Sequence, residues 1–356
     1  MTGTTSIWEA LDRLLAEADV AGVRAHKLGP LAARRLRRLG EPVPRALAEE
    51  ERAAAAATLV ATALLERVRA CCDGALVLIK GPEVGYRYPD RARSFCDLDL
   101  LSPAPRAVHE ALRRSGFAEV EDPELFVDHH HLRPLQLPLL PLKIEIHAGL
   151  PWPPRLSPPE PAEIFEAAGP SVLGIAGISA PAPAHHAIVV AAHAWTTVPL
   201  GRLRDLVDVA ALSAEVPQDE LETTARAWAI ERVWHATHGA AEALLDGGAA
   251  TLPLRLWGRH LASARERTVV DNHLLRWLHP FWELPPPAAL AAWHDALREE
   301  LLPRPGEPWR HKLARVANAA HHPRAPLSSH TAAWSAAAGA GEARPTEAPD
   351  VDRGRN

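Results

Sequence analysis

Residues 76–101, LVLIKGPEVGYRYPDRARSFCDLDLL, predict two short strands joined by a turn-rich segment. The apolar run Leu76–Ile79 ends at a Lys-Gly pair, and Asp97 and Asp99 alternate with leucines in the second strand. Period-two alternation places both carboxylates on one face and the leucines on the other. Two acids this close repel each other unless a cation lies between them. Mg²⁺ suits this arrangement, because it binds one or two carboxylates together with water and phosphate oxygens. The pattern therefore predicts a magnesium site on a buried strand.

The bulk properties of the chain limit its class. At 356 residues it is long enough for two domains, and its formal net charge of −5 argues against a protein that coats nucleic acid or an anionic membrane. We expect no membrane span and no signal peptide, because no apolar run approaches ~18 residues and the N-terminus has no basic flank. Cys71, Cys72 and Cys96 have neither disulfide nor zinc spacing, which favours the cytoplasm. Arginine greatly outnumbers lysine, as in GC-rich bacterial genomes.

The first part of the chain predicts helices. A capping box at Ser6 and Glu9 precedes an apolar-periodic run, a second helix is expected over 21–39, and a third begins near Arg45. We interpret residues 1–74 as an N-terminal helical region.

A small sheet is predicted next. The strand Leu142–Ile146 places Lys143, Glu145 and His147 on one face and its apolar residues on the other. With a helix over 104–115 and a short strand over 117–120, we expect an α+β core that spans residues 75–150.

The remainder divides by composition. Six prolines between residues 151 and 161 cannot sustain a helix or a sheet, so we interpret 151–181 as a Pro-rich linker. Helical periodicity and most of the tryptophans indicate a C-terminal helical domain over 182–320, with one helix expected over 218–245. Alanine, serine, proline, glycine and charged residues dominate 321–356, which we interpret as a disordered tail.

The motifs occur in an order that resembles the DNA polymerase β-like nucleotidyltransferase superfamily, and more narrowly the bacterial family described as uncharacterised nucleotidyltransferase. The chain supplies, in that family's order, Lys80-Gly81, Tyr88-Pro89-Asp90, Arg93, Asp97-Leu98-Asp99-Leu100-Leu101, His130-His131-Leu132 and Glu145-Ile146-His147. The likeness covers residues 75–212 and includes the helix around His193 and the Leu203-Arg204…Asp208 segment. It implies a small mixed-sheet polymerase β-like nucleotidyltransferase core flanked by N-terminal helices and a C-terminal helical region.

The resemblance also implies a catalytic triad. Asp97, Asp99 and Glu145 would hold two Mg²⁺ (or Mn²⁺) ions against the triphosphate of an NTP such as ATP. Glu145 would in addition accept the proton of the attacking hydroxyl. Pyrophosphate would leave as the nucleotidyl group is transferred.

Further residues receive roles in phosphate and substrate binding. Lys80 and Arg93 would neutralise phosphate charge, and Gly81 would let the backbone approach phosphate closely. The wider superfamily has Gly-Ser at this point, whereas this chain has Lys-Gly followed by Pro82, which leaves open whether the donor is an ordinary NTP.

The histidines are less specific signals. His130, His131 and His147 are candidates for substrate contact, while a polar strand end accounts for them equally well. His129, next to them, faces the opposite way from His130 in an extended chain. We interpret His193 and Asp208 as packing residues.

Three classes of function remain open. The leading one is nucleotidyl transfer to a hydroxyl or similar acceptor on a small molecule or peptide; the acidic charge disfavours nucleic acid, although Arg34, Arg35, Arg37 and Arg38 cluster on one predicted helix. The second is a nucleotide-sugar glycosyltransferase that uses the same Asp-x-Asp strand. The third is a non-catalytic nucleotide-binding module of the toxin–antitoxin type.

Overall fold

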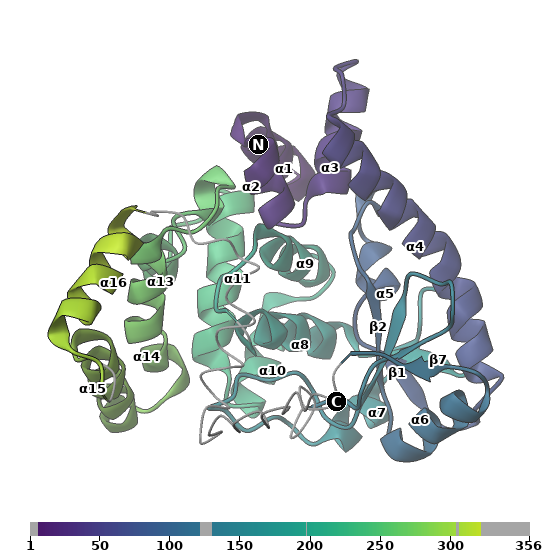
Figure 1. Ribbon diagram of the computed structural model, residues 1–356. Coiled ribbons are helices and arrows are strands. Elements are labelled where there is room, and N and C mark those ends of the chain that lie inside the picture. The colour runs from purple at the N-terminus through teal and green to yellow at the C-terminus, as the bar shows by residue number, and fades with distance from the viewer. Residues whose placement is uncertain (1–5, 122–129, 197, 304–305, 322–356) are drawn as a thin grey trace, which may run out of the picture.

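The computed structural model describes residues 6–121, 130–196, 198–303 and 306–321. Within these ranges the strands form one mixed seven-stranded sheet with helices on both sides, which confirms the expected α+β class (Figure 1). The strands are β1 (Leu76–Leu78), β2 (Asp97–Leu101), β3 (Ala118–Glu119), β4 (Leu135–Gln136), β5 (Lys143–His147), β6 (Gly169–Pro170) and β7 (Ile178–Ala180).

Helices surround the sheet from both ends of the chain. The α-helices are α1 (Ile7–Glu17), α2 (Val20–Ala25), α3 (Gly29–Arg38), α4 (Arg45–Arg69), α5 (Pro82–Gly85), α6 (Pro105–Arg114), α7 (Pro161–Ala167), α8 (Pro183–Thr196), α9 (Leu203–Ser213), α10 (Gln218–Ala227), α11 (Glu231–Leu245), α12 (Leu252–Leu256), α13 (Val269–Leu278), α14 (Pro280–Glu283), α15 (Pro286–Leu301) and α16 (Trp309–His321). Single 3-10 turns, η1 (Pro89–Arg91) and η3 (Leu261–Ser263), complete the described elements.

The sheet places the two acidic strands side by side. Its order is β3-β4-β5-β2-β1-β7-β6. In its centre, β2 pairs antiparallel with β1 and parallel with β5, and β7 adds to the other edge of β1 in parallel. The strands that carry the predicted acids are therefore neighbours that run in the same direction.

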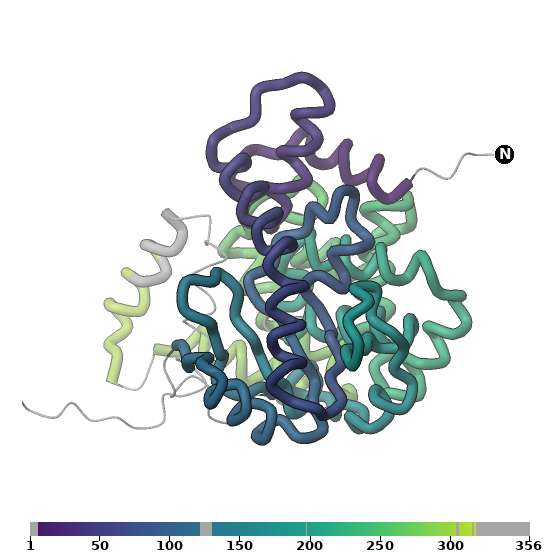
Figure 2. Tube along the Cα trace, turned by 90° about the vertical axis from the view of Figure 1, so that its right-hand side faces the viewer, coloured from purple at the N-terminus to yellow at the C-terminus, as the bar shows by residue number. Residues whose placement is uncertain are grey.

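The two faces of the sheet contact different helices. On one face, residues such as Leu98 and Ile144 pack with apolar residues of α4 and α6, and α4 crosses in front of the sheet in Figure 2. On the other face, Leu101 joins a larger cluster with α8, α9 and α11, which also contains Leu11 of α1 and Leu275 of α13. Helices that precede the sheet thus share one core with helices that follow it.

Two helices predicted as continuous are each interrupted. The expected helix over 21–39 is divided into α2 and α3 by Lys27, which has a φ of 60°. The expected helix over 218–245 is divided into α10 and α11 near Ala229, which has a φ of 51°. A residue in the left-handed region ends an α-helix. Apolar periodicity did not reveal these breaks, because the segments on both sides bury apolar faces in the same core.

The expected linker over 151–181 is wrong for part of its length. It contains α7 and two strands, and β7 pairs with β1 in the central sheet. The prolines interrupt this segment without preventing structure, since Pro161 occupies the first turn of α7, where no backbone N–H is needed. Trp152 and Ile164 are buried, so the segment also contributes to the core.

The end of the chain lies mostly beyond the described residues. The predicted disordered tail, 321–356, lies outside them except for the last residue of α16. Within the described ranges, no helix combines the length and the apolar character that crossing a membrane requires.

Candidate active site

The predicted acidic residues lie on two strands that pair in register. Asp99 lies opposite Glu145, and Asp97 lies opposite Lys143. Because side chains alternate along each strand, these residues project from one face, which we call the polar face. Leu101 of the same face packs in the cluster that contains α8 and α9, so the polar face is turned toward these two helices.

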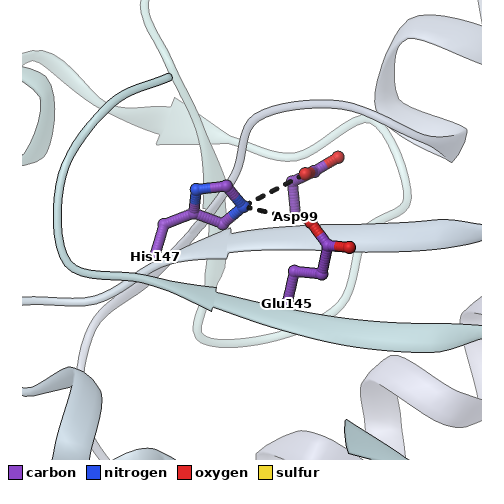
Figure 3. Close-up of side chains that lie close together, drawn as sticks. All are labelled: Asp99, Glu145 and His147. Carbon is purple, nitrogen blue, oxygen red and sulfur yellow. Dashed lines mark hydrogen bonds and ion pairs between the residues drawn. The ribbon is translucent and has the colours of Figure 1, made fainter. Parts of the chain in front are cut away.

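Asp99, Glu145 and His147 form a compact cluster on the polar face. One donor atom from each lies within 4.8 Å of the others. His147 Nε2 lies 3.1 Å from Asp99 Oδ1 and 3.8 Å from Glu145 Oε2, and Figure 3 shows its ring pointing toward both carboxylates. Carboxylate oxygen and imidazole nitrogen are ligands of divalent cations, so this donor set fits such an ion.

The carboxyl groups oppose one another's ionisation. Burial, followed by the charges of Asp99 and Asp97, raises the pKa of Glu145 to about 9. Burial and the charge of Asp99 also raise the pKa of Asp97. For Asp99, burial favours the neutral acid, but the hydrogen bond and charge of His147 and the ammonium of Lys80 outweigh it and lower the pKa. A bound cation would relieve this repulsion.

Lys80 and Gly81 lie at the turn between β1 and α5. Burial lowers the pKa of the Lys80 ammonium, and the nearby carboxylate of Asp99 partly offsets this effect. Gly81 has a φ of 65° and a ψ of −124°, and a Cβ there would lie 3.1 Å from the carbonyl oxygen of Asp97. Only glycine readily adopts this conformation, and it keeps the turn close to the start of β2.

Arg93 forms a buried ion pair with Asp208 of α9. Its Nε donates to Asp208 Oδ1 at 2.8 Å and its Nη2 donates to Asp208 Oδ2 at 2.7 Å, with both side chains almost fully buried. Nη1 lies 3.4 Å from the carbonyl oxygen of Gly81, and the Tyr88 hydroxyl also donates to Asp208. Two nitrogens of the guanidinium are thus paired with a carboxylate of α9, while the expected contact of Arg93 with phosphate stays a prediction. The ion pair attaches the Gly81 turn to α9.

Three of the described histidines cluster beside the carboxylates. The rings of His130, His131 and His147 have centroids 5.0 to 5.2 Å apart. His131 forms a bridge with His147 at the edge of β5, and its Nε2 lies 3.6 Å from Glu145 Oε2. His129 lies outside the described residues.

Two further side chains reach this region from the helices. The pKa of His193 on α8 is well below its usual value, through burial and the charge of Lys80, while Asp99 acts in the opposite direction. Arg204 on α9 partly offsets the rise in the pKa of Asp97 that burial and the charge of Asp99 cause, and its Nη1 lies 3.4 Å from the carbonyl oxygen of Ser94. We had interpreted His193 as a packing residue and given Arg204 no role. Neither has a sequence spacing that relates it to the acids, so only the resemblance pointed to these segments.

A separate cavity of about 580 Å³ is lined by residues of α1, α9 and α11, with Trp8 and His238 among them. Asp97, Asp99, Glu145 and His147 are absent from its lining. The acidic cluster and this cavity are therefore distinct places in the fold.

The chain has a match among known protein families. A family model described as uncharacterised nucleotidyltransferase matches residues 15–246, well over half of the chain. The matched stretch begins in α1, includes the whole sheet and ends just after α11. No curated protein and no solved structure matches the chain significantly.

Proposed function

The chain belongs to the uncharacterised nucleotidyltransferase family, which makes it a transferase of nucleotidyl groups, and on this premise we propose a specific reaction. The protein moves a nucleotidyl group from an NTP to a hydroxyl or similar acceptor on a small molecule or peptide, and pyrophosphate is released. The observation that carries this proposal is that Asp97, Asp99 and Glu145 project from the polar face of adjacent strands, where Asp99 and Glu145 also cluster with His147.

We assign these carboxylates to divalent cations, two Mg²⁺ or Mn²⁺ ions as the resemblance implies. When bound, such ions neutralise phosphate oxygens and stabilise the entering and leaving oxygens of an in-line displacement. The raised pKa values of Asp97 and Glu145 support the assignment, because burial and the neighbouring carboxylates both oppose their ionisation and a bound cation would offset both effects.

The residues of the chain itself hold the reactants and move the proton. The acceptor oxygen forms a bond to the α-phosphorus of the NTP while the bond from that phosphorus to the β-phosphate oxygen breaks. Glu145 takes the proton of the acceptor hydroxyl. The ammonium of Lys80 neutralises phosphate charge, and the turn at Gly81 leaves room for a phosphate oxygen beside the backbone.

The ion pairs of the basic helix α3 favour a small-molecule or peptide acceptor over nucleic acid. Its arginines are largely paired within the protein, which leaves little free positive charge for a phosphate backbone. The ion pairs join Arg34 to Asp90, Arg37 to Glu51 and Arg38 to Asp12. The formal net charge of −5 also disfavours a nucleic-acid acceptor.

The test is an assay of the purified full-length chain with each NTP, Mg²⁺ or Mn²⁺, and a cell extract as the source of acceptor. We expect release of pyrophosphate and a gain of nucleotidyl mass on one acceptor. Asp97→Asn is expected to abolish both without unfolding the protein. Asp73→Asn, at an exposed aspartate outside the sheet, is the matched control and retains activity.

Other outcomes would replace the proposal. A gain of hexose mass would indicate a glycosyltransferase. Metal-dependent NTP binding without turnover would indicate a binding module. Full activity in Asp97→Asn would remove the site assignment.

A further inference from the structure

We propose that nitrogen takes part in holding the metal ion: Nε2 of His147 is a ligand beside the carboxylates of Asp99 and Glu145, and the site selects a first-row transition ion such as Mn²⁺ over Mg²⁺. The inference rests on the proposed nucleotidyl transfer and concerns the identity of its metal.

The spacing of the donor atoms is the first support. His147 Nε2 lies 3.1 Å from one carboxylate oxygen and 3.8 Å from the other. Ligand atoms that sit about 2.0–2.2 Å from a common ion lie about 3–3.6 Å from one another. Both distances from Nε2 are thus close to the separation that a shared ion requires, and the ligand oxygens of Asp99 and Glu145 lie within 4.8 Å of each other.

The orientation of the His147 ring is the second support. The side chain is 1 % exposed, and its Nδ1 is buried without a hydrogen-bond partner among the described residues. Here the contacts of Nε2 with Asp99 and Glu145 are what orient the ring, and they direct it at the space between the two carboxylates (Figure 3).

His131 provides a second nitrogen on the other side of Glu145. Its Nδ1 lies 2.8 Å from the carbonyl oxygen of Leu132, and because a carbonyl only accepts, Nδ1 carries the proton. In the neutral ring Nε2 then presents its lone pair, and it lies 3.6 Å from Glu145 Oε2. A ring N–H held by a backbone carbonyl is the usual support of a metal-binding histidine.

The chemistry of this donor set separates the two candidate ions. Mg²⁺ prefers oxygen ligands in an octahedron and retains several waters. Imidazole nitrogen raises the affinity for first-row transition ions, among which Mn²⁺ also accepts carboxylates. A cluster with one imidazole at Asp99 and a second beside Glu145 therefore favours Mn²⁺.

Pulsed electron paramagnetic resonance of Mn²⁺ bound to the full-length protein, without nucleotide, tests the inference. We expect modulation from directly bound ¹⁴N in the wild-type protein. His147→Ala is expected to remove most of it and to weaken Mn²⁺ binding at least tenfold while changing Mg²⁺ binding less. His235→Ala, at an exposed histidine of α11 bonded to Glu222, is the matched control and leaves the spectrum unchanged.

The wild-type spectrum decides even if a variant fails to fold. Bound Mn²⁺ without ¹⁴N modulation would overturn the nitrogen ligand. Equal affinities for Mn²⁺ and Mg²⁺ would overturn the selectivity. In both cases pyrophosphate release, measured separately, would leave the proposed function standing. Absence of pyrophosphate release together with ¹⁴N modulation would support the nitrogen ligand and contradict the proposed function.

Discussion

The two faces of β2 and β5 differ sharply although alternate residues of the same two strands build them. Toward α4 and α6, Leu98, Leu100, Ile144 and Ile146 are fully buried. Toward α8 and α9, the same strands present carboxylates, and burial together with the charge of Asp99 raises the pKa of Asp97 and of Glu145.

The difference shows how the fold keeps repelling charges together. The burial of apolar side chains on one face stabilises the pairing of β2 with β5. That pairing sets Asp99 opposite Glu145, whatever the repulsion between them. The apolar face thus stabilises the strand pairing, and this pairing holds together the carboxylates of the polar face, which repel each other. The following predictions test this division.

The largest effect is expected from Asp99→Asn on the polar face. We expect pyrophosphate release to fall by about 10²–10³-fold or more, because a preorganised charge at the reacting centre is lost. The free energy of unfolding should fall by only about 1–2 kcal/mol, since the lost contacts with His147 and Lys80 are partly offset by removing a charge that repels Asp97 and Glu145. Kinetic assays measure the activity, and chemical unfolding measures the stability. A variant that is strongly destabilised while its folded fraction stays active would show that Asp99 contributes to stability and not to activity.

Asp208→Asn tests a polar pair that is structural. Removing the charge leaves Arg93 buried without its counterion, which is expected to cost about 3–5 kcal/mol of unfolding free energy. Urea unfolding at pH 7 measures it. A loss of unfolding free energy smaller than that expected for an exposed ion pair would show that the Gly81 turn does not depend on the contact between Arg93 and Asp208.

The same pair predicts a pH dependence. Burial favours the neutral acid of Asp208, but the charge and hydrogen bonds of Arg93 outweigh it and lower the pKa in the folded protein. A lowered pKa stabilises the fold above the ordinary value of aspartate, about 3.9, and this contribution is lost as the pH falls below it. The difference in unfolding free energy between wild type and Asp208→Asn should therefore shrink in acid. A difference that stays constant from pH 7 to pH 3 would contradict the assignment.

Ile144→Ala changes the apolar face one residue before Glu145. A fully buried isoleucine truncated to alanine is expected to cost about 2–5 kcal/mol of unfolding free energy. Activity per folded molecule should stay near the wild-type value, because no polar-face side chain is altered. Glu145→Gln is the matched partner, with the opposite expectation on both measurements. Equal losses of activity in the two variants would show that the faces are not separable.

Gly81→Ala is expected to cost about 1–3 kcal/mol of unfolding free energy, because alanine is strained at this backbone conformation. Its Cβ would also press on the carbonyl oxygen of Asp97, so we expect a fall in activity beyond the loss of folded protein. Gly74→Ala, where a Cβ meets no atom within 4 Å, is the control for thermal unfolding and activity. Equal behaviour of the two variants would remove the role given to the turn.

Local pattern in the chain was sufficient for part of this description. The alternation of acids and leucines in 97–101, and of charged and apolar residues in 142–147, predicted which side chains share a face within each strand. It did so because the period of a strand is a property of its own backbone. The helices that border the sheet were predicted for the same reason, while single left-handed residues inside two of them were not.

Tertiary structure decided how these pieces meet. Glu145 lies 46 residues beyond Asp99 in the chain, and strand pairing sets them opposite each other. The same packing directs the His147 ring at both carboxylates, gives Arg93 its partner on α9 and adds β7 to the sheet from a segment that composition marked as a linker. The physical reason is that contacts between distant residues depend on register and on which faces bury each other. No local period in the sequence encodes either of these.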